Sequence, residues 1–139
     1  MMVAVRYHSR TGNTEKLANA IADELGVKAE NLSVPLPEKT VILFLGSAVY
    51  AAGVDDEVKR FLKENKDKIG ILYNFSTAAI LSSTYKQVKK LASENGISVS
   101  RKEFHCRGKF KFLHGSRPNE EDLQNAKKFA RGILQGDKQ

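Results

Sequence analysis

The sequence predicts an α/β fold, in which helices cover both faces of a parallel β-sheet. Two observations lead to this prediction. Strand-like and helix-like segments alternate five times along the 139 residues. Two of the strands, 40–46 and 69–75, are continuous apolar runs of the kind that a sheet buries on both faces. The length suits a single domain, 1–139, with a sizeable core.

The first half of the chain begins with a strand and a helix. Residues 2–8 show some alternation and contain β-branched residues, which predicts a strand. From Asn13 onward, apolar residues recur at helical spacing, which predicts a helix that ends at Gly26. A weaker strand is predicted over 27–34. Two prolines within 35–39 predict a loop before the first buried strand.

The second half repeats this alternation. Helices are predicted over 54–67 and 84–94, with Gly96 closing the second. The alternating segment 97–106 suits a strand at the edge of the sheet. Asn119 is the predicted N-cap of a last helix, because the acidic residues after it suit the positive end of a helix. The apolar residues of that helix that are expected to face the core are Leu123, Ala126, Ala130, Ile133 and Leu134.

Composition excludes several classes of protein. The single cysteine, Cys106, rules out an intramolecular disulfide, and no Cys/His cluster has the spacing of a zinc site, so we expect no bound metal. The first residues lack the apolar stretch of a signal peptide, and the run 41–45 is too short to cross a bilayer. We therefore expect a cytoplasmic protein that does not insert into membranes.

The net charge of +7 is confined to one segment. Residues 86–117 contain nine basic and two acidic residues, whereas the rest of the chain is balanced. Such a segment is either a solvated basic surface or a docking surface for an acidic partner. Binding of nucleic acid is not expected, because the aromatic residues are not interleaved with the basic ones as a stacking platform requires.

The loop after the first strand has the composition of an anion site. It is predicted to run into the start of a helix, whose unpaired N–H groups and dipole favour a negative charge. Gly12 allows a tight turn, and hydroxyl, amide and guanidinium groups surround it. The candidate phosphate ligands are Ser9, Arg10, Thr11, Gly12, Asn13 and Thr14. The alternative is an ordinary turn in which Thr11 or Asn13 only caps the helix.

Beyond these physical patterns, "SRTGNT" resembles the phosphate-binding loop of flavodoxins, S/T-x-T-G-x-T. The segments "LGSAVYAAGVDDEVKRFL", "FSTAA", "FHCRGKF" and "RPNEEDLQNAKKFA" resemble later parts of small flavodoxin-like proteins, so the likeness covers nearly the whole chain. The resemblance implies a three-layer flavodoxin-like fold with a five-stranded parallel sheet of order 2-1-3-4-5. It also implies noncovalent binding of FMN.

The resemblance further implies where FMN would lie. Its phosphate would occupy the loop at 9–14, and its isoalloxazine ring would lie between two loops rich in small residues. The expected ring contacts are Ser47, Ala48, Val49, Tyr50, Ala51, Ser76, Thr77, Ala78 and Ala79. Tyr50 is the one aromatic residue in these loops, and it is expected either to stack on the ring or to pack at the rim of the site.

Some features differ from the electron-carrying members of the family. The chain has no tryptophan, and Ala51 and Ala52 stand where glycine is usual. The protein is also basic, whereas electron-carrying flavodoxins are characteristically acidic. These differences leave two functions open: FMN-dependent electron transfer, which we favour, or an FMN-dependent reductase of quinones or similar small acceptors.

Electron transfer by bound FMN requires no side chain to act as acid or base, and no catalytic residue is predicted. His8 is expected to be a structural hydrogen-bonding residue, and Cys106 a small buried residue at the end of a strand.

Overall fold

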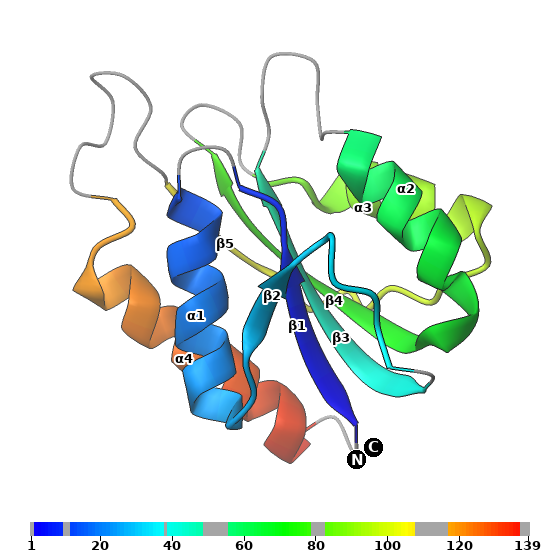
Figure 1. Ribbon diagram of the computed structural model, residues 1–139. Coiled ribbons are helices and arrows are strands. Elements are labelled where there is room, and N and C mark those ends of the chain that lie inside the picture. The colour runs from blue at the N-terminus through cyan, green and yellow to red at the C-terminus, as the bar shows by residue number, and fades with distance from the viewer. Residues whose placement is uncertain are drawn as a thin grey trace.

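A five-stranded parallel sheet forms the centre of the molecule, and helices cover both of its faces (Figure 1). The computed structural model describes residues 2–9, 12–37, 39–48, 56–78, 83–107 and 117–136, without the side chains of Ala48, Ala78 and Arg107. The strands are β1 (Val3–Tyr7), β2 (Ala29–Asn31), β3 (Thr40–Ala48), β4 (Ile69–Ala78) and β5 (Phe104–Arg107). Their order is β2-β1-β3-β4-β5, which confirms the expected sheet.

Two helices lie on each face of this sheet (Figure 1). The helices are α1 (Asn13–Leu25), α2 (Asp56–Asn65), α3 (Tyr85–Glu94) and α4 (Glu120–Gly136), and a 3₁₀ turn, η1 (Lys66–Lys68), follows α2. α1 and α4 pack on one face, and α2 and α3 pack on the other. This arrangement confirms the predicted three layers.

The α1/α4 face is held by an aromatic core. The Phe44 ring stacks on Tyr73 at a centroid distance of 5.4 Å and meets Phe129 of α4 edge-on at 6.1 Å. Phe44 and Phe75 are fully buried. Since burial of one such side chain stabilises the fold by about 1.5–3 kcal/mol, these rings are a main reason why α4 packs against the sheet.

A buried arginine holds the connection between β2 and β3 on the other face. The Arg6 guanidinium donates hydrogen bonds to the carbonyl oxygens of Val34 (2.9 Å), Pro35 (3.1 Å) and Val5 (3.0 Å). Burial lowers the pKa of Arg6, and the nearby Glu30 carboxylate opposes that shift. The sequence pattern did not predict this role, because an arginine in an alternating strand is expected to face solvent.

The edge strand predicted over 97–106 is wrong in its first part. Only Val99 forms an isolated bridge, to Leu72, before β5 begins at Phe104. Between them the Ser100 hydroxyl accepts a hydrogen bond from the Lys102 N–H at 3.1 Å, and this local turn replaces strand pairing.

Two other predicted segments are longer than the structure has them. The strand predicted over 27–34 is confined to β2, and the helix predicted to reach residue 67 ends at Asn65 and passes into the 3₁₀ turn η1.

The predicted helix ends are confirmed at three places. Gly26 and Gly96 adopt left-handed φ values of 71° and 72° after α1 and α3. Before α4, the Asn119 side chain accepts a hydrogen bond from the Asp122 N–H at 2.9 Å, and the Asp122 carboxylate accepts one from the Asn119 N–H at 2.8 Å. This reciprocal pair satisfies two N–H groups that the helix itself leaves unpaired.

Candidate functional site

The turn from β1 into α1 brings several donor groups together. Gly12 is the N-cap of α1 with φ 86°, and it has no side chain with which to cap the helix. The first N–H groups of α1 therefore have no acceptor within the helix. The Gly12 N–H itself donates to the Ser9 hydroxyl at 2.9 Å, which fixes the turn. Arg10 and Thr11, also predicted as phosphate ligands, lie outside the described residues.

A pair of buried threonine hydroxyls lies directly behind this turn. The Thr14 Oγ1 atom of α1 and the Thr77 Oγ1 atom of β4 are 2.9 Å apart, and both residues are at most 2% exposed. One hydrogen bond joins two hydroxyls, so one of their two protons remains for another acceptor. The structure thus joins two predicted site residues that are 63 positions apart in sequence.

α1 approaches the sheet closely below these hydroxyls because Gly46 of β3 has no side chain. A Cβ atom at Gly46 would lie 2.2 Å from Cε2 of Phe75 and 2.9 Å from Cγ2 of Thr14. Gly46 therefore lets Phe75 and the first turn of α1 pack over the strand.

A second polar cluster lies on the α3 face of the same sheet edge. Ser47 of β3, Asn74 and Ser76 of β4, and Thr84 before α3 are all at most 1% exposed and are joined by hydrogen bonds. Ser47 and Ser76 were predicted as ring contacts, whereas Asn74 and Thr84 were not. The signal for Asn74 is its position as an amide within the apolar run 69–75.

The two strands that precede the predicted ring loops end side by side. Ser47 pairs with Ser76, and Ala48 pairs with Thr77, in the parallel ladder between β3 and β4. The other predicted ring contacts, Val49, Tyr50, Ala51 and Ala79, lie outside the described residues. Their roles stay predictions.

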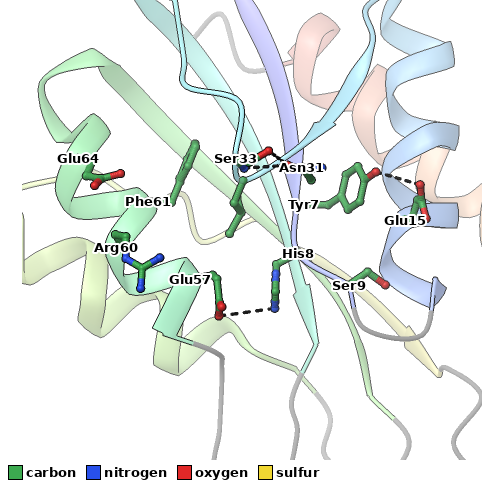
Figure 2. Close-up of a pocket in the computed structure, with 11 residues that line it drawn as sticks. Tyr7, His8, Ser9, Glu15, Asn31, Ser33, Glu57, Arg60, Phe61 and Glu64 are labelled. Carbon is green, nitrogen blue, oxygen red and sulfur yellow. Dashed lines mark hydrogen bonds and ion pairs between the residues drawn. The ribbon is translucent and has the colours of Figure 1, made fainter.

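A pocket of about 620 Å³ borders the turn from β1 into α1 on the side of β2 (Figure 2). Within it, the Tyr7 hydroxyl donates to the Glu15 carboxylate at 2.9 Å. Burial and this hydrogen bond raise the pKa of Tyr7. On the opposite side, His8 Nε2 lies 3.9 Å from Oε2 of Glu57 in α2, so His8 links the end of β1 to the neighbouring helix when it is protonated.

The sequence pattern did not predict this pocket. It combines Glu15, Glu57 and Glu64 with Arg60 and His8, and these residues come from α1, from α2 and from the position directly after β1. The structural role expected for His8 stays a prediction.

The Cys106 thiol is only partly buried, and burial is the main reason why its pKa is raised to about 12. The Asp122 carboxylate raises this pKa further, whereas Arg117 lowers it. Such a thiol stays protonated at neutral pH, which is the inert state expected of a structural cysteine.

The part of the chain that the structure describes contains no group of three or more acidic, histidine or cysteine residues placed to hold a metal ion. Among the described helices, none has the length and apolar character to cross a membrane.

The basic segment 86–117 is distributed over several elements. Lys86 and Lys89 are exposed on α3, and Arg101 is exposed ahead of β5. Arg117 is bound to Asp122 by two hydrogen bonds, one of them 2.7 Å long, and so it acts within the fold. The residues 108–116 lie outside the described part of the chain.

Comparison with known proteins agrees with this geometry. An uncharacterized protein of Methanocaldococcus jannaschii, MJ0298, is 30% identical over 135 residues, which cover 88% of this chain and 90% of that protein. A flavodoxin from the domain Archaea superposes with a TM-score of 0.79 at 19% identity and 100% coverage of both chains. Oxidised flavodoxin 1 from Bacillus cereus superposes with a TM-score of 0.75 at 16% identity, covering 98% of this chain and 99% of that one. These two structural likenesses concern the fold.

The family described as "Flavodoxin domain" matches residues 4–113, which include the described strands except Val3 of β1, together with α1, α2 and α3. The chain belongs to the flavodoxin family.

Proposed function

We propose that the protein binds FMN noncovalently and carries electrons between redox partners. The observation that supports this most strongly is the turn from β1 into α1, where the N-terminus of a helix with glycine as its N-cap lies together with two hydroxyl residues. A phosphate monoester requires several N–H and O–H donors around one anion, and this turn contains them. The donor set therefore fits the 5′-phosphate of FMN.

Each described hydroxyl of the turn has a proton to donate. The Ser9 hydroxyl accepts the Gly12 N–H, which leaves its own proton for the phosphate. The Thr14–Thr77 pair retains one proton as well. Phosphate binding would thus use Ser9, Gly12, Asn13 and Thr14, together with Arg10 and Thr11.

The ring would lie between the loops that follow β3 and β4. Small side chains at Ser47, Ala48, Ser76, Thr77 and Ala78 allow the backbone to approach a flat ring closely. Val49, Tyr50, Ala51 and Ala79 would complete the contacts. Bound FMN supplies the redox chemistry, and the chain binds it, orients it and tunes the electrostatics around it.

The decisive experiment compares FMN with riboflavin, which lacks the phosphate. The purified protein is expected to take up added FMN and to quench its fluorescence. Thr14→Val removes the hydroxyl and nearly preserves the shape of the side chain. Because a hydrogen bond to a charged group contributes about 1.5–3 kcal/mol, FMN affinity should fall about tenfold or more while riboflavin affinity changes little.

Thr14→Ser is the matched control, since it retains the hydroxyl and should bind FMN nearly as the unmodified protein does. Equal losses for FMN and riboflavin in Thr14→Val would show that Thr14 does not serve the phosphate. Failure of the unmodified protein to take up FMN would overturn the proposed function.

A second candidate function is reduction of quinones or similar small acceptors. The segment 76–84, "STAAILSST", has no aromatic residue to cover the second face of the ring, which would leave room for a flat substrate. Steady-state oxidation of NAD(P)H with a quinone as acceptor separates the two functions, because a pure carrier shows almost no turnover without a partner reductase.

The proposed partner is a redox protein with an acidic surface. Lys86 is exposed in the first turn of α3, directly after the carboxyl edge of the sheet, and Lys89 and Lys90 follow on the same helix. An acidic partner that docks there would approach the proposed flavin site, with association that weakens as salt rises.

A further inference from the structure

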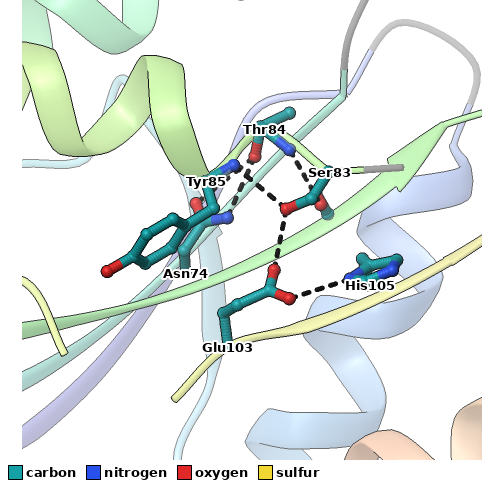
Figure 3. Close-up of polar contacts among 7 residues, drawn as sticks. Asn74, Ser83, Thr84, Tyr85, Glu103 and His105 are labelled. Atoms are coloured by element: carbon teal, nitrogen blue, oxygen red, sulfur yellow. Dashed lines mark hydrogen bonds and ion pairs between the residues drawn. The ribbon is translucent and has the colours of Figure 1, made fainter. Parts of the chain in front are cut away.

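The Thr84 side chain forms the centre of the polar cluster on the α3 face. It is completely buried, and its Oγ1 atom accepts hydrogen bonds from the Ser47 hydroxyl at 3.0 Å and from the Asn74 amide at 3.1 Å. Its own proton faces the Asn74 Oδ1 atom at a longer distance of 3.4 Å (Figure 3). The Thr84 N–H donates to the Ser76 hydroxyl at 3.3 Å.

These contacts use the whole hydrogen-bonding capacity of one hydroxyl. A threonine hydroxyl has one proton and two acceptor sites, and the contacts with Ser47 and Asn74 engage all three. Thr84 therefore has no hydrogen-bonding group left for a ligand, so its effect on a ligand would be exerted through its neighbours.

The cluster joins three segments that border the predicted ring loops. Ser47 lies at the end of β3, Asn74 and Ser76 lie near the end of β4, and Thr84 immediately precedes α3. Removal of the Thr84 hydroxyl would leave buried donors on both Ser47 and Asn74 without an acceptor. Because an unsatisfied buried donor is costly, the strand ends would shift to recover partners.

A neighbouring series of hydrogen bonds holds the start of α3 from the other side. The Ser83 hydroxyl accepts the Tyr85 N–H at 3.0 Å and donates to Glu103 at 2.7 Å (Figure 3). The second oxygen of Glu103 lies 2.8 Å from Nδ1 of His105. With α3 held in this way, Thr84 is a fixed point against which the ends of β3 and β4 are aligned.

We propose that Thr84 is a positioning residue for the flavin site, one that holds the ends of β3 and β4 in place against the start of α3 through Ser47 and Asn74. This inference rests on the proposed binding of FMN. Unlike the residues that are expected to contact the ring, Thr84 would not touch the cofactor.

The test compares two variants of Thr84 with a control at a second buried threonine. Thr84→Val removes the hydroxyl, Thr84→Ser retains it, and Thr40→Val makes the same change at the start of β3. The Thr40 residue is 1% exposed, and its hydroxyl has no hydrogen-bond partner among the described residues. Three quantities are measured for each variant, well below its unfolding temperature. They are the affinity for FMN, the visible absorption bands of the FMN-saturated protein, and the midpoint potential of the bound FMN.

Thr84→Val is expected to weaken FMN binding on the order of tenfold and to change the absorption bands and the potential. Thr84→Ser should bind FMN within about twofold of the affinity of the unmodified protein and should have the same absorption bands and potential. Thr40→Val should leave all three quantities unchanged. If Thr84→Val does not fold, Asn74→Ala, which removes the amide that donates to the same hydroxyl, replaces it in the comparison.

Two results would overturn the inference, and they are distinguishable. If the unmodified protein binds FMN and Thr84→Val binds it with the same affinity and spectrum, the positioning role is wrong and the proposed function stands. If the unmodified protein does not bind FMN, both are wrong.

Discussion

Replacement of Gly46 by alanine should strongly destabilise the fold. The added Cβ atom would lie 2.2 and 2.4 Å from two carbon atoms of the Phe75 ring and 2.9 Å from Cγ2 of Thr14. Carbon atoms pack at about 3.5–4.0 Å, so the ring would have to move by more than about 1 Å. Because Phe75 is fully buried and has aromatic neighbours in the core, it cannot turn into solvent.

The size of the effect follows from the cost of overpacking a core. Such insertions cost about 1–3 kcal/mol, and the severity of this overlap points to the upper end. A chain of 139 residues has an unfolding entropy of about 0.3 kcal/mol per kelvin. A loss of about 3 kcal/mol therefore corresponds to a decrease of about 10 °C in Tm.

Gly132→Ala is the matched control. Gly132 lies within α4, and a Cβ atom there would meet nothing within 4 Å. Alanine in the interior of a helix is favoured over glycine by about 0.5–1 kcal/mol, so Tm should rise by about 2–3 °C. Thermal unfolding followed by circular dichroism measures both shifts. An unchanged or higher Tm for Gly46→Ala would refute the close-packing argument.

Three further outcomes are expected. Burial of the Asp122 carboxyl would raise its pKa, but its contacts with Arg117 and Asn119 outweigh burial and hold the pKa below the usual 3.8. The ionised carboxylate therefore stabilises the folded protein fully above pH 3.8. This stabilisation is lost as the pH falls through the lower pKa that Asp122 has in the folded state. In urea unfolding, the stability difference between the unmodified protein and Asp122→Asn should therefore shrink toward the acid end, and a constant difference would contradict this. Since the pKa of Cys106 is about 12, roughly one thiol in ten thousand is ionised at pH 8, and iodoacetamide should react far faster with the urea-unfolded protein. Lys86→Glu should slow reduction by an acidic iron–sulfur ferredoxin at low salt more than Lys63→Glu, at the far end of α2, and equal rates would argue against docking at α3.

Local patterns in the sequence predicted most of the fold. The continuous apolar runs of β3 and β4 and the glycines after α1 and α3 each have one simple structural explanation, and the structure agrees with them. The prediction of an edge strand over 97–106 is wrong in its first part because one hydrogen bond, from the Lys102 N–H to the Ser100 hydroxyl, competes with strand pairing. Alternation alone contains no information about such competition.

The candidate site was predicted less completely, because its geometry depends on contacts between distant segments. The turn from β1 into α1, the proposed phosphate site, is local, and its glycine and hydroxyl residues could be recognised in sequence. The Thr14–Thr77 pair and the role of Thr84 require the strand register and the helix positions. Arg6 could not be predicted as buried, because its partners are carbonyl oxygens of a distant loop that leave no trace in composition.

The interruption after Val99 has a consequence for association between molecules. The outer strands of the sheet, β2 and β5, have three and four residues, whereas β3 and β4 in the middle have nine and ten. An exposed strand edge offers unpaired N–H and C=O groups on which another chain can add a strand, and a longer edge offers a better template for aggregation. A continuous strand over 97–106 would have more than doubled the length of that edge. The turn at Ser100 therefore limits edge-to-edge growth of the sheet into larger assemblies.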